Sequence, residues 1–383
     1  MKCEKLFQAI DSLNEEYLQF LIDICTIESP TEYKEGVDRV GKYITDKAKA
    51  KGWMVETQHQ EISGDAIAIT MNPDAPGEAV CFSGHTDTVH PIGSFGKVPV
   101  RCDETKIYGP GVTDCKGGLA ASFMAMDALR QCGFQERPIK LLIQTDEENG
   151  SRNSNKTTIR YLGEKAKGCI AFLNTEFATK ESIVISTKGI LKYRFKVTGK
   201  AVHSYRCQNG ASAICEAAQK IIRLEKFKNP EEITCNCGLI QGGSAENTVP
   251  EECTFTADFR YYTQKERELI EKTVKELANT SFVEGTSCSY TLASSRVAME
   301  KTQRNVDLFN KVHDIHLENG LGEAKMIGLF GGTDAADITQ MGIPCLEGFG
   351  LIGGKIHNIG EYAEIDSLAF AAKRLASVAY CIK

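Results

Sequence analysis

Five short segments carry the residues whose types and spacing could do chemistry. In CFSGHTDTVH, His85 follows an apolar stretch, and Asp87 lies two residues further on. Residues i and i+2 of an extended chain share a face, so the Asp87 carboxylate could accept the second ring N–H of a metal-bound His85 imidazole. Taken alone, an H-x-D pair is more typical of two polar residues at the end of a strand.

The second and third segments add carboxylates. In YGPGVTDCKGG, Asp114 lies in a turn just before a helix, where it could cap the helix or bridge two cations through its two oxygens. In LLIQTDEENGS, an apolar strand ends in Asp146, Glu147 and Glu148. Such carboxylates repel one another unless water or cations neutralise them. Neighbouring ones point in different directions, so one could bind a metal while another faces a substrate as a base.

The last two segments complete a set of metal ligands. FLNTEF is an apolar strand that ends in Glu176, and GGKIHNIGEYAEI carries His357 in a glycine-flanked loop. Histidine and carboxylate ligands are those that Zn²⁺ accepts. Open α/β sheets bind ligands outside the carboxyl ends of their strands, where four of the five segments end. Together the segments predict a dinuclear site with one bridging carboxylate.

The pattern of apolar residues predicts the elements that must position these side chains. Helices are expected at 33–48 and 119–129, and buried strands at 66–70, 79–82 and 139–143. From 191 to 293 the expected order is strand, helix, strand, strand, helix, strand, which is typical of a four-stranded sheet with two helices on one face. We therefore expect a split α/β domain, 1–187 and 297–383, interrupted by a second domain at 188–296.

Composition limits the classes of protein and partner. The 383 residues are 42% hydrophobic and 25% charged with a net charge of −6, which is typical of a globular chain of about two domains. No basic run predicts a nucleic-acid partner, and no apolar run predicts a membrane span. The first 25 residues are expected to form an amphipathic helix rather than a signal peptide. Fifteen cysteines, including the C-x-C pair Cys235 and Cys237, favour free thiols and a cytoplasmic location.

The motifs HTD, GPGVTDCKGG, DEENGS, NTE and a late H-N-x-x-E, in this order and spacing, resemble one family. It is the co-catalytic zinc peptidase and amidohydrolase family, which includes glutamate carboxypeptidase, acetylornithine deacetylase, succinyl-diaminopimelate desuccinylase, aminoacylase and carnosine dipeptidase. The resemblance covers essentially the whole chain. It implies a mixed-sheet α/β catalytic domain with helices on both faces, and an inserted ferredoxin-like α+β lid domain.

The resemblance also implies two zinc ions that share one carboxylate, with cobalt or manganese as substitutes. The implied ligands are His85, Asp114 and Glu176 for one ion, and Asp114, Glu148 and His357 for the other. Asp87 would orient His85, and Glu147 would be the general base for a metal-bridging water. Glutamate at 176 resembles the carboxypeptidases and deacylases more than the aminopeptidases and dipeptidases.

Further residues resemble the family's substrate contacts: His203, Asn247, Arg260, Gly332 and Thr333. His203, in TGKAVHS, would donate to the oxyanion, often in a neighbouring subunit's site. Without the resemblance, Arg260 is better interpreted as a strand-surface residue paired with Asp258. After His203 the family often has a proline-containing stretch, whereas this chain has SYRCQNG.

The sequence therefore predicts hydrolysis of an amide or peptide bond next to a free carboxylate. The expected substrate is a peptide or N-acyl amino acid, and the expected assembly is a homodimer through the inserted domain. An alternative is a biosynthetic deacylase of the acetylornithine or succinyl-diaminopimelate type, which needs extra polar groups for the distal end of its substrate. A catalytically inactive binding protein would be expected to have lost ligand or base residues, and all seven are present.

Overall fold

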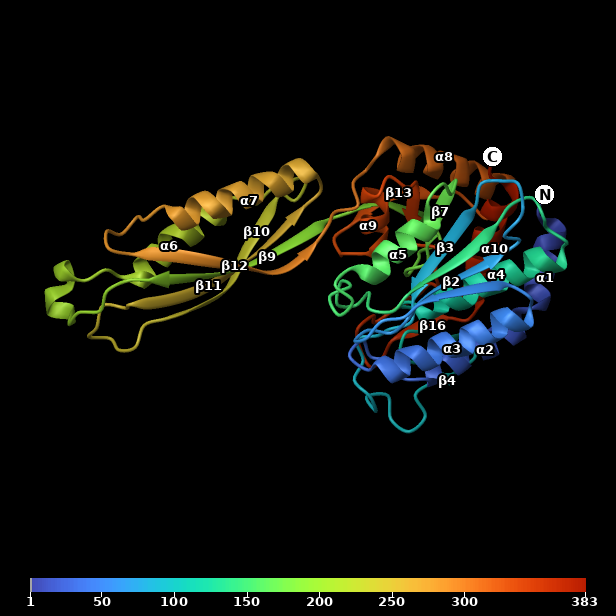
Figure 1. Ribbon diagram of the computed structural model, residues 1–383, viewed down its shortest axis with the longest axis horizontal. Coiled ribbons are helices and arrows are strands. Elements are labelled where there is room, and N and C mark those ends of the chain that lie inside the picture. The colour runs from blue at the N-terminus through green and yellow to red at the C-terminus, as the bar shows by residue number, and fades with distance from the viewer. Residues whose placement is uncertain (1) are drawn as a thin grey trace. The chain divides into compact units, whose positions relative to one another are not determined.

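The computed structural model describes residues 2–383. They divide into two compact units (Figure 1). Unit 1 contains the chain up to Ile185, Lys301–Gly328 and Thr333–Lys383, and unit 2 contains Ser186–Glu300 and Leu329–Gly332. The predicted insertion, 188–296, falls within unit 2, which also takes in the short segment 329–332.

A mixed sheet lies at the centre of unit 1. Within residues 2–383 it has eight strands, in the order β1-β2-β6-β3-β7-β14-β8-β13. Strands β6, β3, β7 and β14 are parallel to one another, whereas β1, β2 and β8 pair antiparallel with their neighbours. The interior strands are almost entirely buried, as a sheet covered on both faces requires. The strands are β1 (Met54–Gln58), β2 (Ala66–Met71), β3 (Val80–His85), β6 (Ile139–Gln144), β7 (Ala171–Asn174), β8 (Ser182–Thr187), β13 (Lys325–Leu329) and β14 (Cys345–Glu347).

Helices cover both faces of this sheet (Figure 1). Helices α4 and α10 pack against each other on one face with α1 and α2 beside them, and α5 and α9 pack together on the other. This arrangement confirms the predicted mixed-sheet domain. The helices are α1 (Glu4–Ser12), α2 (Asn14–Thr26), α3 (Lys34–Ala50), α4 (Lys116–Gln131), α5 (Thr157–Ala166), α8 (Gln303–Glu318), α9 (Asp334–Gln340) and α10 (Asp366–Cys381).

Helix α4 is buried along nearly its whole length and begins against the end of β7. A Cβ on Gly117 would lie 2.2 Å from the Val112 carbonyl oxygen, and one on Gly118 would lie 2.1 Å from that of Thr175. Both positions need glycine because any side chain would collide with this backbone. Asp114, which lies two residues before the helix, is thereby held beside the end of β7.

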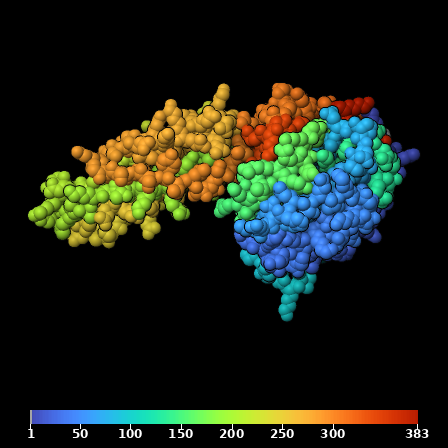
Figure 2. Space-filling model, viewed as in Figure 1, coloured from blue at the N-terminus to red at the C-terminus, as the bar shows by residue number. Residues whose placement is uncertain are grey.

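A small second sheet of unit 1 joins two distant loops. It has the order β15-β16-β5-β4, and Tyr108 in β5 pairs with Tyr362 in β16. This pairing brings the turn that leads to Asp114 close to the loop that carries His357. Strands of two or three residues leave no pattern in the sequence, so this sheet was not predicted. Its strands are β4 (Arg101–Cys102), β5 (Lys106–Tyr108), β15 (Gly353–Gly354) and β16 (Tyr362–Glu364). The exposed segment 91–98, which precedes β4, projects from the surface of unit 1 (Figure 2).

Unit 2 is an antiparallel sheet with two helices. The strand order β10-β11-β9-β12 and the chain order βαββαβ confirm the predicted ferredoxin-like fold. Buried and exposed residues alternate along β9, so one face of the sheet packs against α6 and α7. The elements are β9 (Gly189–Thr198), η1 (Ser204–Asn209), α6 (Ala213–Leu224), β10 (Thr234–Gly242), β11 (Glu252–Tyr261), α7 (Gln264–Asn279) and β12 (Ser287–Arg296).

Some elements differ from the sequence prediction. The expected N-terminal helix is two helices, α1 and α2, which meet at Leu13, where Ser12 and Asn14 are poor helix formers. Helix α6 starts at Ala213, where the Ser212 side chain caps it by accepting from the Cys215 N–H. None of the helices in residues 2–383 has the length and apolar character needed to span a bilayer.

Candidate metal centre and active site

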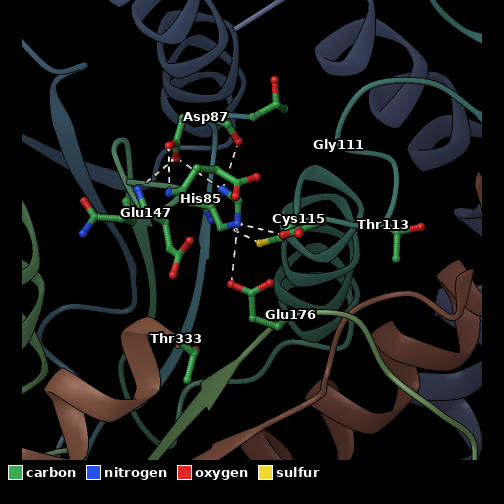
Figure 3. A network of polar contacts seen from close by, with 12 residues as sticks. His85, Asp87, Gly111, Thr113, Cys115, Glu147, Glu176 and Thr333 are labelled. Atoms are coloured by element: carbon green, nitrogen blue, oxygen red, sulfur yellow. Dashed lines mark hydrogen bonds and ion pairs between the residues drawn. The ribbon is translucent and has the colours of Figure 1, made fainter. Parts of the chain in front are cut away.

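The parallel strands of unit 1 deliver polar side chains to one edge of the sheet. His85 is the last residue of β3, Glu147 and Glu148 follow the end of β6, and Glu176 follows the end of β7. Because these strands run in the same direction, their carboxyl ends lie together. Figure 3 shows His85 at the centre, with Asp87 on one side and Cys115 and Glu176 on the other. The structure therefore brings together residues that are up to about ninety positions apart in sequence.

The two oxygens of Asp114 face two different histidines. Oδ1 lies 3.1 Å from His85 Nε2, and Oδ2 lies 3.2 Å from His357 Nε2. His85 Nε2 is also 3.5 Å from Glu176 Oε1, and His357 Nε2 is 3.2 Å from Glu148 Oε2. The His85 side is deeply buried, whereas the His357 side chain is 55% exposed. The cluster therefore has a closed side and an open side.

These distances fit a pair of zinc ions. Ligand atoms held at about 2.0–2.2 Å around a tetrahedral ion lie roughly 3.3–3.6 Å from each other. The contacts of 3.1–3.5 Å among the histidine nitrogens and carboxylate oxygens are close to that spacing. Two overlapping groups of possible ligands have all their ligand atoms within 4.8 Å: His85 with Asp114 and Glu148, and His85 with Cys115 and Glu176. Imidazole and carboxylate donors in this geometry suit borderline divalent cations.

Asp87 holds both the histidine and the acidic segment in place. Its carboxylate is fully buried and accepts the backbone N–H groups of Glu147 at 3.2 Å and Glu148 at 3.1 Å. The Thr31 hydroxyl donates to it at 2.8 Å. His85 Nδ1 lies 3.0 Å from the Asp87 carbonyl oxygen and 3.3 Å from its carboxylate. An Nδ1–H that donates here leaves the Nε2 lone pair facing Asp114 and Glu176.

Burial and charge shift the pKa values of the cluster in opposite directions. Burial raises the pKa of Glu148 to about 7 and that of Glu176 well above its usual range. Burial also disfavours ionised Asp114, but hydrogen bonds with His357 and His85 outweigh it and lower the pKa of Asp114. Hydrogen bonds with Asp114 and Glu148 raise the pKa of His357 to about 10. So many buried carboxylates require positive charge among them, which protons or cations can supply.

Glu361 and His90 were not among the predicted site residues. The buried Glu361 carboxylate accepts the backbone N–H groups of Thr113 at 2.9 Å and Asp114 at 3.0 Å, and Gly111 donates at 3.2 Å. His90 Nε2 lies 2.8 Å from the same carboxylate. Glu361 therefore fixes the loop that carries the central carboxylate. The late H-N-x-x-E motif contains it and was the available signal, whereas nothing in the sequence pairs it with His90.

Glu347 is a second residue that the sequence did not reveal. It ends β14, next to β7 in the sheet, and is 4% exposed. Its carboxylate contacts the hydroxyl of Thr333 and lies 3.4 Å from Asn174 Nδ2. Burial raises the pKa of Glu347 to about 7. Thr333, a predicted substrate contact, is thus buried in unit 1 at the start of α9.

Cys115 lies beside the predicted ligands as a buried thiol. Its sulfur accepts the backbone N–H of His85 at 3.2 Å, and the contact is drawn in Figure 3. Burial raises the pKa of Cys115. This environment favours the thiol over the reactive thiolate. Its evident role is to pack the start of α4 against the end of β3.

The other predicted substrate contacts belong to unit 2, where they fall into two groups. His203 and Asn247 lie together. The Ser204 N–H donates to the Asn247 carbonyl at 2.8 Å, and the backbones of His203 and Thr248 form an isolated antiparallel β-bridge. Arg260 lies near the end of β11, where its guanidinium donates to the Phe330 carbonyl at 3.3 Å. A Cβ on Gly332 would meet the Arg296 side chain at 2.4 Å.

Arg260 also has the ion pair that the sequence offered as the simpler interpretation. Its Nε and Nη2 lie 2.8 and 3.3 Å from the two carboxylate oxygens of Asp258. The bidentate pair orients the guanidinium and uses two of its five donors. Its remaining donors are sufficient for a carboxylate, so the role in substrate binding stays a prediction.

A family model described as peptidase family M20/M25/M40 matches residues 81–380, a stretch that contains every predicted metal ligand. The chain belongs to this peptidase family. The predicted resemblance is therefore confirmed, and membership of the M20/M25/M40 family makes the protein a metal-dependent hydrolase.

Relatives of this M20/M25/M40 protein extend over nearly its whole length. Carboxypeptidase G2 from Pseudomonas sp. (strain RS-16) is 29% identical over 374 residues, which cover 95% of this chain and 88% of the relative. Succinyl-diaminopimelate desuccinylase from Rickettsia bellii (strain RML369-C) is 25% identical over 372 residues, with coverage of 91% and 92%. The crystal structure of aminopeptidase PepT from Bacillus cereus ATCC 10987 has the same fold, with a TM-score of 0.80, 20% identity and coverage of 96% and 98%.

Proposed function

We propose that the protein uses two zinc ions to hydrolyse an amide or peptide bond next to a free carboxylate. The substrate would be a small peptide or an N-acyl amino acid. One observation carries the proposal: Asp114 turns one carboxylate oxygen toward His85 and the other toward His357, at 3.1 and 3.2 Å. A carboxylate between two imidazoles has the geometry that a bridging ligand of a dinuclear site needs.

The proposed ligands form two sets that share Asp114. His85 and Glu176 would complete the first set, and Glu148 and His357 the second. Cobalt or manganese could replace zinc at nitrogen and oxygen ligands of this kind. When bound, the metal pair would polarise the scissile carbonyl and lower the pKa of a bound water from about 16 to about 7.

Glu147 is the proposed general base. It is 6% exposed, and the Asp87 carboxylate anchors its backbone N–H beside His85. Glu147 would take the proton from the attacking water and pass it to the leaving amine, a role typically worth about 10² to 10⁴ in rate. Asp87 would align the base and the first ligand together.

The residues of unit 2 support a homodimer. Arg260 pairs with Ile190 at the start of β9, whereas His203 follows the end of that strand. A strand from Gly189 to Thr198 is about 30 Å long. One small substrate cannot contact both ends of the same copy of unit 2. We therefore propose that one copy supplies Arg260 and Gly332, and that the other supplies His203 and Asn247.

Metal analysis combined with a substrate panel tests the proposal. The purified chain should release the C-terminal residue of small peptides, or cleave the amide bond of N-acyl amino acids. It should lose this activity with a chelator and regain it with Zn²⁺ or Co²⁺. His357→Ala should lose at least one of two metal ions per chain, whereas the matched control His59→Ala, an exposed histidine paired with Asp65, should keep both. Two full equivalents in His357→Ala would overturn the ligand assignment.

A biosynthetic deacylase is the second candidate. The 25% identity to a succinyl-diaminopimelate desuccinylase over 91% of this chain supports it. Including N-acetylornithine and N-succinyl-diaminopimelate in the panel separates the two candidates. Preferential turnover of either would replace the carboxypeptidase assignment and retain the metal site. Absence of turnover with two metals bound would favour a binding protein on this fold.

A further inference from the structure

Two cysteines at opposite ends of the chain lie side by side in unit 1. Cys3 precedes α1, and Cys381 is the last residue of α10. Their sulfur atoms are 3.6 Å apart, although 378 positions separate them in sequence. Figure 1 marks both chain ends on the same side of unit 1, and α1 packs against α10. The folded core, rather than local sequence, sets this proximity.

The end of α8 holds both cysteines. The buried Asn319 accepts the Cys3 backbone N–H at 3.1 Å through Oδ1, and its Nδ2 lies 4.0 Å from the Cys381 sulfur. Asn319 is itself fixed, because Nδ2 donates to the Ile315 carbonyl at 2.8 Å. One buried amide therefore contacts both members of the pair.

Cys381 is the more accessible and the more acidic member of the pair. Cys381 is partly exposed, and the C-terminal residues reach the surface of unit 1 (Figure 2). The hydrogen bond shared with Cys3 lowers the pKa of Cys381 to about 7, with a contribution from the Lys2 ammonium. The same hydrogen bond raises the pKa of Cys3, just as hydrogen bonds with Cys169 and Cys237 raise those of Cys81 and Cys235.

We propose that Cys3 and Cys381 form an oxidation site, at which a hydroperoxide converts the two thiols into a disulfide that joins the two ends of the chain. The Cys381 thiolate attacks one peroxide oxygen, the O–O bond breaks, and the alkoxide or hydroxide leaves and takes up a proton. The resulting sulfenic acid is attacked by the Cys3 sulfur, the S–S bond forms, and water leaves. Two thiols lose two electrons and two protons in total, and the hydroperoxide is reduced to an alcohol (or water) and water.

The Cys3–Cys381 disulfide would make the folded protein more stable and would leave its hydrolytic activity unchanged. A disulfide that closes a loop of nearly the whole chain restricts the unfolded state. All fifteen cysteines are free thiols in residues 2–383. The predicted cytoplasmic location stays a prediction. The pair would thus remain reduced there until an oxidant appears.

Peptide mapping of the full chain tests the proposal. The reduced protein is treated under native conditions with one equivalent of hydrogen peroxide, blocked with N-ethylmaleimide, and analysed by mass spectrometry without reduction. The expected result is a loss of 2 Da, a cross-linked peptide pair containing Cys3 and Cys381, and a Tm higher by about 3 °C or more that dithiothreitol reverses. Cys3→Ser and Cys381→Ser should abolish the cross-link, whereas the matched control Cys132→Ser, an exposed cysteine after α4, should retain it.

The mapping of the unmodified chain decides the outcome even if a variant folds poorly. A disulfide found first at Cys235 and Cys237, or at any other pair, would overturn the proposal. Alkylated or singly oxidised Cys381 without a cross-link to Cys3 would overturn it as well. Because neither cysteine contacts the proposed ligands, hydrolytic activity of the cross-linked protein should be unchanged.

Discussion

The main sheet of unit 1 and the sheet of unit 2 place their polar residues differently. In unit 1 the parallel strands are buried on both faces, and chemistry-bearing residues gather where β3, β6 and β7 end. In unit 2 the two central strands, β9 and β11, alternate buried and more exposed residues, and the predicted substrate contacts are separated by the length of β9. The carboxyl ends of neighbouring parallel strands bring the first set together, whereas the second set can act on one substrate, under the proposed function, only if two chains cooperate.

The largest expected effect comes from the base. Glu147→Gln should lower kcat about 10³-fold, because the water would lose its proton acceptor, while metal content stays unchanged. Steady-state kinetics and elemental analysis of the same preparation measure both. Glu164→Gln, on the exposed part of α5, is the matched control. Turnover close to that of the control would remove Glu147 from the mechanism.

A mixing experiment sharpens the contrast between the units. His203→Ala alone should lower kcat about 10² to 10³-fold if it removes an oxyanion donor. After subunit exchange between His203→Ala and Glu147→Gln, half of the dimers are mixed, and each mixed dimer has one site with both residues intact. About a quarter of the unmodified activity should return. If no activity returns although exchange is demonstrated, His203 does not act across a dimer.

Substitution of Asp87, the carboxylate that anchors His85 and the acidic segment, should have a smaller effect, and this effect should be on metal affinity. Asp87→Asn would present an N–H in place of one acceptor oxygen, so it cannot hold His85 and both backbone N–H groups of Glu147 and Glu148. Affinity for zinc should fall about 10 to 100-fold, measured by competition with a chromogenic chelator. Asp146→Asn, a neighbouring buried acid that is bonded to Ser154 and Thr158 instead, is a control for local destabilisation.

The smallest effect should be on stability. Gly118→Ala places a methyl group 2.1 Å from the Thr175 carbonyl oxygen, so the start of α4 must shift. Overpacking of this kind costs about 1–3 kcal/mol. Denaturant unfolding measures the loss of unfolding free energy. The comparison variant is Gly133→Ala, just after α4, where no atom lies within 4 Å of the new Cβ. Because Gly133 has a positive φ, its substitution reports backbone strain without a clash.

The sequence predicted those parts of the fold and site that depend on local pattern. Apolar runs marked β3, β6 and β7, and strand-end polar residues such as His85 and Glu176 followed from them. Parts that depend on long-range pairing were missed. Glu361 accepts backbone N–H groups about 250 positions away, and Glu347 ends a strand of only three residues. Neither hydrogen bonds to distant backbone nor very short strands leave a periodic signal.

The late position of Glu361 has a consequence for the making of the protein. The loop around Asp114 is held by the Glu361 carboxylate, which lies four residues after His357 in the sequence. During synthesis the chain emerges from its N-terminus, so Asp114 and Glu147 are exposed to the cell long before these last partners exist. The loop around Asp114 therefore cannot take its final hydrogen-bonded form until Glu361 has been synthesised.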